Sequence, residues 1–310
     1  MPIAGIFRRP CRPLEQFVTV FIQLLFRFFS LMPLPVLHAA GWVVGWLSFL
    51  LSPRYRRRLM AHVRQAGFSR GVALASVGEA GKMAVETTRL WLGAPMKVGW
   101  EGASLIEAAM AHGSGVLFLT PHLGCFEITA QAVAQRFGDR MTTTVLFRPS
   151  RQPWLRDLVA HSRERPGLLT APTTLAGVKQ LIKALKTGQA VGLLPDQVPP
   201  AGQGVWAPYF GREAYTMTLS ARLARTPGVQ PVLIWGERLS WGRGFLVHVR
   251  PFPGLAEEGL SSDPQTAARQ INQAMEMLVR ESPAQYLWSY DRYKQPRQPE
   301  SPDTGAAPQR

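Results

Sequence analysis

Residues 116–127 read Val-Leu-Phe-Leu-Thr-Pro-His-Leu-Gly-Cys-Phe-Glu. The apolar run at the start of this stretch is typical of a buried strand, and it stops at a proline. His122 follows at once, and Glu127 comes five residues later. Residues 128–137 then have the spacing of a helix. The stretch therefore predicts a strand-to-helix junction, with His122 at the junction and Glu127 about one turn into the helix.

That junction has a chemical use. A carboxylate on Glu127 can accept a hydrogen bond from one imidazole nitrogen of His122, while the other nitrogen faces a substrate. A base held in this way can take a proton from an alcohol, which acyl transfer to a hydroxyl requires. A purely structural role for His122 is the alternative that the residues alone leave open, because a histidine followed by an acid at this spacing is common.

Strand-like and helix-like patterns alternate along the rest of the chain. Predicted strands cover residues 98–101, 116–120, 142–147, 168–170, 190–194, 229–235 and 245–249, and predicted helices cover residues 54–92, 105–111, 128–137, 154–165, 175–186, 218–225 and 266–280. This alternation predicts an α/β fold with a mostly parallel mixed sheet flanked by helices. Such sheets bind ligands beyond the carboxyl ends of their strands, and His122, Arg148 and Asp196 each follow a predicted strand.

Residues 17–51 are the most apolar part of the chain. Prolines at 33 and 35 divide them into two helical halves of about 16 residues, shorter than the roughly 20 that a straight membrane span needs. The first half is amphipathic, and the second contains Gly41 and Gly45, a spacing that permits close helix packing.

Arginines flank this apolar segment on both sides: Arg8, Arg9 and Arg12 before it, and Arg54, Arg56, Arg57 and Arg58 after it. The positive-inside rule places both flanks on the cytoplasmic side, which suits a hairpin or an in-plane anchor. We expect residues 1–53 to form a membrane-anchoring helical segment, 54–294 the α/β domain and 295–310 a disordered tail rich in Pro, Gln and Ser. A cleaved signal peptide and helices that cover a soluble core remain alternatives.

The composition narrows the class of protein. A hydrophobic content of 46% in 310 residues excludes a disordered chain and a polytopic membrane protein. The net charge of +15 implies an anionic partner. The two cysteines predict no disulfide framework, and no cofactor or metal site is expected because the six histidines lack ligand spacing. No nucleic acid is expected either, since no recognised fold for binding it is present.

Several further motifs, taken in order, resemble those of one family. They are Leu34-Pro35-Val36-Leu37, Glu86-Thr87, His122 with Glu127, Phe147-Arg148-Pro149, the segment from Lys186 to Gln197 that ends in Pro-Asp-Gln, the segment from Ala207 to Gly211, the segment from Gln285 to Trp288, and Arg292-Tyr293-Lys294. Over residues 20–294 the chain resembles the lipid A late acyltransferases (lauroyl/myristoyl acyltransferases), a branch of the lysophospholipid acyltransferase superfamily.

The resemblance implies a mechanism. His122 would be the general base, Glu127 would orient it, and the acceptor hydroxyl would attack the thioester directly, with no acyl-enzyme. Backbone N–H groups near Gly124, at a helix N-terminus, would stabilise the oxyanion. Arg148 and Arg163 match family arginines and would bind substrate or support the site. Asp196 would belong to the substrate-binding site together with Gly124 and the two arginines, and would lock its loop or pair with an arginine rather than transfer protons.

The resemblance also implies partners and a place in the cell. The acyl donor would be an acyl carrier protein thioester, an acidic partner that suits a basic surface. The acceptor would be a phosphorylated glycolipid of the lipid A precursor type, on an anionic membrane surface at the cytoplasmic face of a bacterial inner membrane. A lysophospholipid acceptor is the first alternative. A non-catalytic basic protein that binds membranes or nucleic acid is the second.

The chain departs from the family pattern in three places. Ser289-Tyr290-Asp291 stand where the family often has basic residues, Ala214-Tyr215-Thr216 stand where the family has Ala-Thr-Thr, and the loop 198–204 differs from the usual basic connector. These changes bear on the identity of the acceptor more than on the chemistry.

Overall fold

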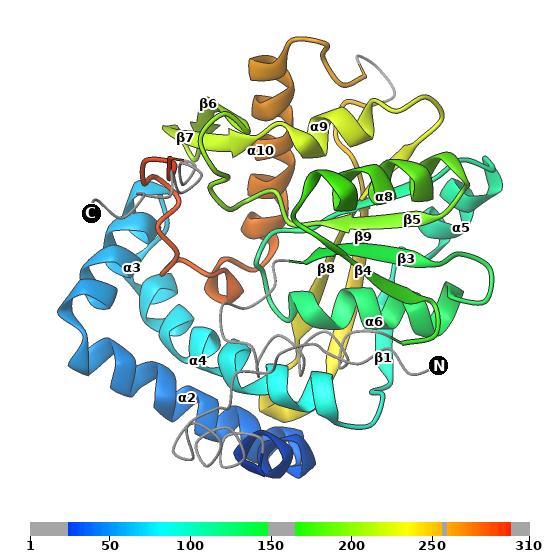
Figure 1. Ribbon diagram of the computed structural model, residues 1–310. Helices are drawn as coiled ribbons and strands as arrows, with labels where there is room; N and C mark the ends of the chain where they lie inside the picture. The colour runs from blue at the N-terminus through cyan, green and yellow to red at the C-terminus, as the bar shows by residue number, and fades with distance from the viewer. Residues whose placement is uncertain (1–23, 148–164, 256–258, 299–310) are drawn as a thin grey trace, which may run out of the picture.

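The computed structural model describes residues 24–147, 165–255 and 259–298 (Figure 1). In these residues seven strands form one sheet in the order β1-β9-β8-β2-β5-β3-β4. The strands are β1 (Val98–Glu101), β2 (Val116–Leu119), β3 (Thr143–Phe147), β4 (Leu168–Pro172), β5 (Ala190–Leu193), β8 (Gln230–Arg238) and β9 (Phe245–Pro251). β8 and β9 pair antiparallel, and the other neighbours pair parallel. The predicted mostly parallel mixed sheet is confirmed.

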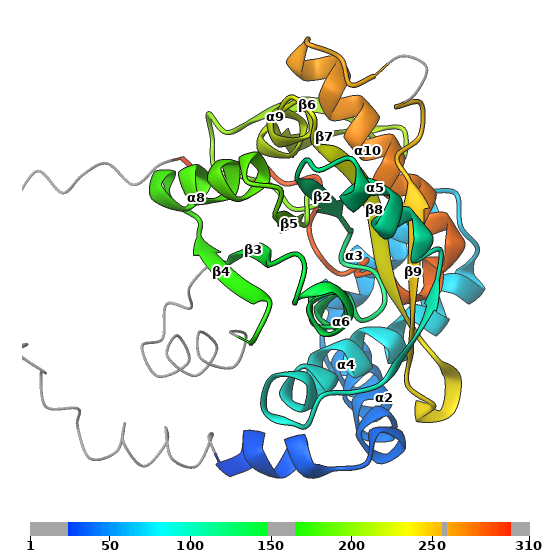
Figure 2. The same ribbon diagram turned by 90° about the vertical axis from the view of Figure 1, so that its right-hand side faces the viewer.

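Helices cover both faces of this sheet. They are α2 (Leu34–Leu51), α3 (Pro53–Gln65), α4 (Arg70–Leu92), α5 (Ser104–Ala111), α6 (Phe126–Phe137), α8 (Leu175–Lys186), α9 (Leu219–Ala224) and α10 (Pro264–Glu281), with short 3-10 turns at η1 (Ser240–Gly242) and η2 (Pro283–Gln285). Figure 2 shows α6 on one side of the sheet and α8, α9 and α10 on the other.

The core explains why the strands read as continuous apolar runs. Along β2, Leu117 and Leu119 belong to the cluster that includes α8 and α10, whereas Val116 and Phe118 belong to the cluster that includes α5 and α6. Successive side chains of a strand point to opposite faces. Because helices bury both faces, every position of β2 is apolar.

A hairpin that the sequence did not predict joins β6 (Gly204–Tyr209) to β7 (Arg212–Met217). Its two-residue turn, Phe210-Gly211, has positive φ at both positions, 47° and 76°. The usual sequence signal for such a turn is Asn-Gly or Asp-Gly. Phenylalanine rarely takes this conformation, so the turn gives no local signal.

Some expectations concern residues outside the described ranges. These are Arg148 and Arg163, the predicted helix 154–165, the first residues of the apolar segment and most of the predicted tail. Residues 24–31 are helical, as expected.

α2 packs closely against α4, along one side of the molecule (Figure 1). A methyl group added at Gly45 would lie 2.2 Å from the backbone oxygen of Val77, and one at Gly81 would lie 1.9 Å from that of Gly41. These contacts confirm the close packing predicted for Gly41 and Gly45, with α4 as the partner.

The outer face of α2 is apolar and exposed. Its exposed large side chains are Val36, Trp42, Val43, Val44, Leu47, Leu50 and Leu51. Of the described helices, α2 alone is long and apolar enough to cross a membrane, and a third of its span is buried in the protein.

The register of the sheet positions the candidate site. β2 and β5 are parallel neighbours, and Leu119 lies opposite Leu193. His122 comes three residues after Leu119, and Asp196 comes three residues after Leu193. The two side chains therefore leave the sheet side by side at its carboxyl edge.

Candidate functional site

Asp196 holds both the side chain and the backbone of His122. Its Oδ1 lies 2.7 Å from the imidazole Nδ1, and its Oδ2 accepts a hydrogen bond of 2.9 Å from the His122 backbone N–H. The Asp196 side chain is 2% exposed, whereas that of His122 is 15% exposed. The carboxylate is therefore buried beneath the ring, and the ring reaches the surface.

The electrostatics keep this carboxylate charged. Burial alone would raise the pKa of Asp196, but the charge of His122 and the two hydrogen bonds from that residue outweigh burial and lower the pKa below its usual value. An ionised Asp196 accepts hydrogen bonds only, so Nδ1 of His122 carries the proton that it donates. The remaining nitrogen, Nε2, is then the base.

Two neighbouring side chains, Gln197 and Phe126, also contact the ring of His122. The side-chain amide of Gln197 donates to Nε2 of His122 over 3.0 Å. The ring of Phe126 packs at 4.8 Å between centroids, tilted by 58°. The imidazole is thus fixed in orientation from two sides, and Asp196 binds it from below.

Glu127 lies in the first turn of α6, as the sequence predicts. Its Oε2 accepts a hydrogen bond of 3.3 Å from the indole N–H of Trp91, at the end of α4. The carboxylate that the structure places on Nδ1 is that of Asp196, from a neighbouring strand end. Spacing along the chain could not show this, because the contact depends on the register of β2 and β5. The role of Glu127 stays a prediction.

Gly124 makes the turn between His122 and α6. Its φ is +57°, and a methyl group there would lie 2.0 Å from the backbone oxygen of Gly236. Its N–H donates to the carbonyl of Gln285, and the N–H of Cys125 donates to that of Gly236. Both N–H groups therefore bond within the fold in this structure. The next N–H groups, at the start of α6, are those that a helix leaves without an intrahelical partner.

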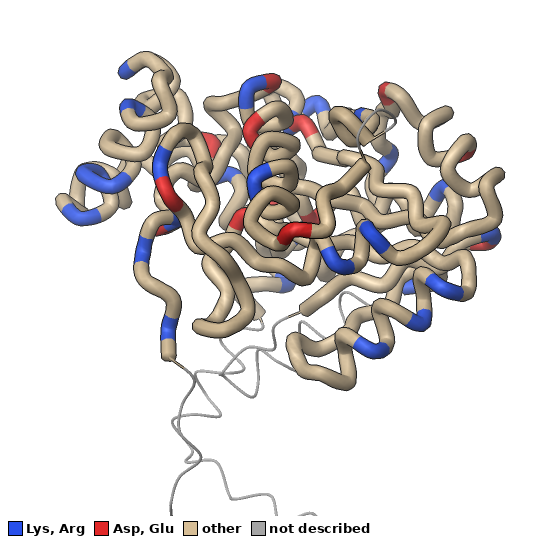
Figure 3. The backbone as a smooth tube through the Cα atoms, turned by 90° about the horizontal axis from the view of Figure 1, so that it is seen from above, with Lys and Arg blue, Asp and Glu red and all other residues tan. Residues whose placement is uncertain are grey.

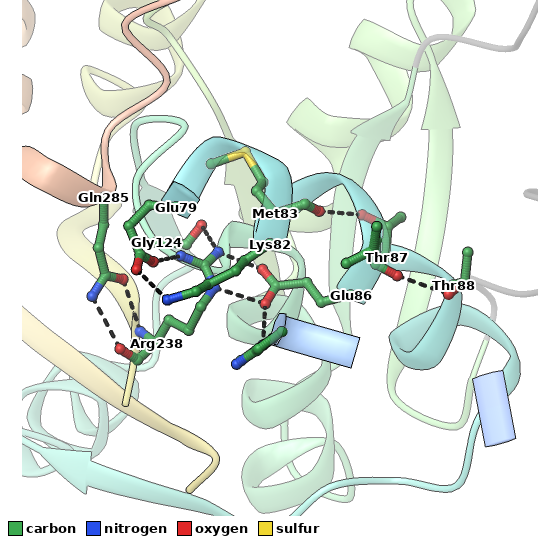
Figure 4. A network of polar contacts seen from close by, with 11 residues as sticks. Glu79, Lys82, Met83, Glu86, Thr87, Thr88, Gly124, Arg238 and Gln285 are labelled. Carbon is green, nitrogen blue, oxygen red and sulfur yellow. Dashed lines mark hydrogen bonds and ion pairs between the residues drawn. The ribbon is translucent and has the colours of Figure 1, made fainter. Parts of the chain in front are cut away.

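A buried ion-pair network lies behind this turn (Figure 4). The guanidinium of Arg238, on β8, binds both oxygens of Glu86, with 2.8 Å from Nε and 2.5 Å from Nη2. It also binds Glu79 at 2.7 Å and donates to the backbone oxygen of Gly124 at 3.1 Å. The network therefore ties α4 to the turn that carries His122.

Two further contacts extend the network. Nε2 of His38, on α2, lies 3.0 Å from Oε2 of Glu86. The side chain of Gln285 accepts from the backbone N–H of Arg238 and donates to its carbonyl. No local pattern in the sequence indicates a role for Arg238, which is the single arginine of a mostly apolar strand. Glu86 is recognisable in the sequence only as part of a family motif.

Cys125 lies in the core behind the site. Cys125 is 1% exposed, and burial together with the charge of Glu86 raises the pKa of its thiol well above the usual value. It packs in the core, as the sequence indicates. Within the described residues, no group of histidine, cysteine and acidic side chains could hold a metal ion.

Comparison with known proteins gives a consistent family. The family model "Bacterial lipid A biosynthesis acyltransferase" matches residues 7–295. The chain is 25% identical over 278 residues to a lipid A biosynthesis lauroyltransferase of Escherichia coli (strain K12), which covers 85% of this chain and 87% of that protein.

Two other relatives from the same organism align over shorter lengths. A lipid A biosynthesis palmitoleoyltransferase is 25% identical over 73% of this chain and 69% of its own. A lipid A biosynthesis myristoyltransferase is 26% identical over 62% of this chain and 57% of its own. With a family model that spans nearly the whole sequence, the chain belongs to the bacterial lipid A biosynthesis acyltransferases, in the late acyltransferase branch, and is an acyltransferase.

Proposed function

We propose that this protein moves a fatty acyl chain from an acyl carrier protein thioester to a hydroxyl of a phosphorylated glycolipid of the lipid A precursor type, with Nε2 of His122 as the general base. The observation that carries the proposal is the buried carboxylate of Asp196 on Nδ1, at the carboxyl edge of the sheet. That contact leaves Nε2, which accepts a hydrogen bond from the amide of Gln197, as the unprotonated nitrogen of the ring.

The proposed step follows from this geometry. Nε2 of His122 takes the proton of the acceptor hydroxyl as its oxygen attacks the thioester carbonyl carbon. Asp196 stabilises the imidazolium that forms. When the tetrahedral intermediate collapses, the carbon–sulfur bond breaks and the thiol leaves with the proton from His122. No acyl-enzyme is formed.

Other groups of the site would support this step. We propose that the first N–H groups of α6, beyond Gly124, stabilise the oxyanion. Arg148 and Arg163 would bind the acceptor phosphate. Glu127, which lies in the first turn of α6 and accepts a hydrogen bond from Trp91 at the end of α4, would act at the same edge of the site as His122.

We also propose that the protein acts at the cytoplasmic face of a bacterial inner membrane. The exposed apolar face of α2 would lie in the bilayer surface, next to the arginines of α3. Basic residues are spread over the outer helices of the described chain (Figure 3). A basic surface suits both anionic lipid and an acidic carrier protein.

The first test is acyl transfer from labelled acyl carrier protein thioester to a lipid A precursor in detergent, for the wild type and for His122→Ala. A general base contributes about 10² to 10⁴-fold in rate, so we expect a loss of that size in a folded variant. Unchanged transfer by His122→Ala would remove this residue from the mechanism.

A panel of acceptors decides the other part of the proposal. If the wild type transfers the acyl chain only to lysophospholipids, the glycolipid acceptor is wrong and the base assignment stands. If replacing the carrier protein thioester with acyl coenzyme A leaves the rate unchanged or raises it, the assigned donor is wrong.

A separate measurement addresses the membrane. We expect binding to vesicles that contain anionic lipid, and weaker binding for the double variant Arg54→Glu/Arg57→Glu, because each basic residue near such a surface contributes about 1 kcal/mol. The double variant Lys179→Glu/Lys183→Glu, on exposed residues of α8, is the matched control. Equal loss in both double variants would show that net charge matters and α3 does not.

A further inference from the structure

The amide of Gln197 occupies the nitrogen that the proposed reaction needs. Its Nε2 lies 3.0 Å from Nε2 of His122, and Gln197 directly follows Asp196, which holds the other ring nitrogen. Two consecutive residues after β5 therefore bind both nitrogens of one imidazole. In the sequence, Gln197 is recognisable only as the last residue of a Pro-Asp-Gln motif.

The two contacts have opposite hydrogen-bond directions. A carboxylate only accepts and the nitrogen of an amide only donates, so Nδ1 donates to Asp196 and Nε2 accepts from Gln197. Together they select the neutral ring with its proton on Nδ1. Either contact alone would leave the second nitrogen to solvent, since the ring of His122 is 15% exposed.

We propose that Gln197 is a positioning residue: its amide keeps His122 neutral, with the Nε2 lone pair aimed at the place where the acceptor hydroxyl binds. The hydroxyl must donate to the same lone pair before it can be deprotonated. It therefore replaces the amide when the acceptor binds. This inference rests on the proposed function for the identity of the acceptor and on the structure alone for the hydrogen bond.

The loop that carries Gln197 is itself anchored. The backbone N–H of the next residue, Val198, donates to the hydroxyl of Tyr290 over 2.9 Å. Asp196, at the end of β5, binds the ring of His122, and Arg292, from the C-terminal segment, acts on Asp196. Glu127 follows Phe126, whose ring packs on His122, at the start of α6. None of these changes when Gln197 is replaced by an uncharged side chain of the same length.

The first test needs no substrate. In the full-length protein in detergent, with ¹⁵N-labelled histidine, His122 is assigned by the signal lost in His122→Ala. We expect the wild-type ring to carry its proton on Nδ1 at neutral pH. In Gln197→Met the donor to Nε2 is lost, so the ¹⁵N signals of His122 should shift away from those of a ring with its proton on Nδ1 only. In Gln197→Glu a carboxylate faces Nε2 and favours a proton there, so the shift of the signals should be larger.

Gln180→Met is the matched control, because Gln180 is exposed on α8. It should leave the signals of His122 unchanged. A wild-type ring that carries its proton on Nε2 would overturn the proposal. So would ¹⁵N signals of His122 that are the same in Gln197→Met, Gln180→Met and the wild type.

The second test uses the acyl transfer assay. For Gln197→Met we expect kcat to fall by about tenfold and the acidic limb of the pH–rate profile to move to higher pH, with no increase in the KM of the acceptor. An increased acceptor KM with kcat unchanged would make Gln197 an acceptor-binding residue instead, and the proposal would be wrong.

The two tests separate this inference from the proposed function. Shifted signals of His122 in Gln197→Met would support the hydrogen bond even if no acceptor is acylated by the wild type. In that case the proposed acceptor or donor fails, and a change in the signals of His122 on titration with each candidate acceptor would show which one displaces the amide. No change with any acceptor, including one that the wild type acylates, would overturn the displacement.

Discussion

The turn at residues 122–125 lies between two pairs that each contain a buried acid. On one side Asp196 holds His122, whose second nitrogen accepts a hydrogen bond from Gln197. On the other side Arg238 and Glu86 are each 1% exposed in the side chain and bind each other through two hydrogen bonds. The second pair is more buried and more highly charged, yet it has no group to offer a substrate. On His122, by contrast, Nε2 is bound only by the neutral amide of Gln197, which a substrate hydroxyl can replace, and this distinguishes the chemical pair from the structural one.

The largest effect is expected when one of two acids is replaced: Asp196, which binds the proposed base, or Glu127, which follows it by five residues in the sequence. Asp196→Asn removes the charge that holds the proton on Nδ1, and a comparable loss in other His–Asp pairs costs about 10⁴-fold in rate. We expect the rate of acyl transfer to fall by about 10² to 10⁴-fold, with the fold retained by circular dichroism. Glu127→Gln is the matched variant. If Glu127→Gln loses the rate and Asp196→Asn keeps it, the original assignment of Glu127 as the orienting acid is right.

The next test breaks the other pair. Arg238→Met leaves Glu86 buried without its guanidinium, which typically costs about 3 to 5 kcal/mol in the free energy of unfolding. We expect a lower denaturant midpoint while the ring of His122 keeps its proton on Nδ1. The double variant Arg238→Met/Glu86→Leu should recover part of the loss, because no charge is then left unpaired. A single variant that is as stable as the wild type would contradict the network.

The smallest effect is the dependence of stability on pH. Burial would raise the pKa of Glu86, but the charge and hydrogen bonds of Arg238 lower it below its usual 4.5, and the pKa of Asp196 lies below its usual 3.8. In the unfolded chain these groups bind protons at a higher pH. Their stabilisation is therefore complete above about pH 4.5 and is lost as the pH falls through the lower folded values.

Urea unfolding between pH 6 and pH 3 measures this dependence. We expect the midpoint to fall below about pH 4.5, and to fall less steeply in Glu86→Gln and Asp196→Asn than in the wild type. A wild-type midpoint that does not change over this range would show that neither carboxylate is stabilised by its partner.

The sheet and its flanking helices could be predicted from the sequence. A strand that is buried on both faces is a continuous run of apolar residues, and such a run is a local pattern. The sequence also placed His122 and Asp196 at strand ends on one edge of the sheet. It could not pair them, since the contact depends on how β2 and β5 align, and the nearer acid, Glu127, fits the local spacing. Arg238 lies 152 residues from Glu86 in the chain. No local sequence pattern indicates a partner at that distance along the chain.

The close packing of α2 on α4 has a consequence for where the reaction can occur. Glycine contacts leave no room for α2 to slide along α4, and His38 of α2 reaches Arg238 and the backbone of Gly124 through Glu86. The apolar face of α2 and the imidazole of His122 thus belong to one rigid body. A bilayer that holds α2 would hold the base at one height above the lipid surface. A hydroxyl would then be selected by how far its headgroup carries it out of the membrane, in addition to its own chemistry.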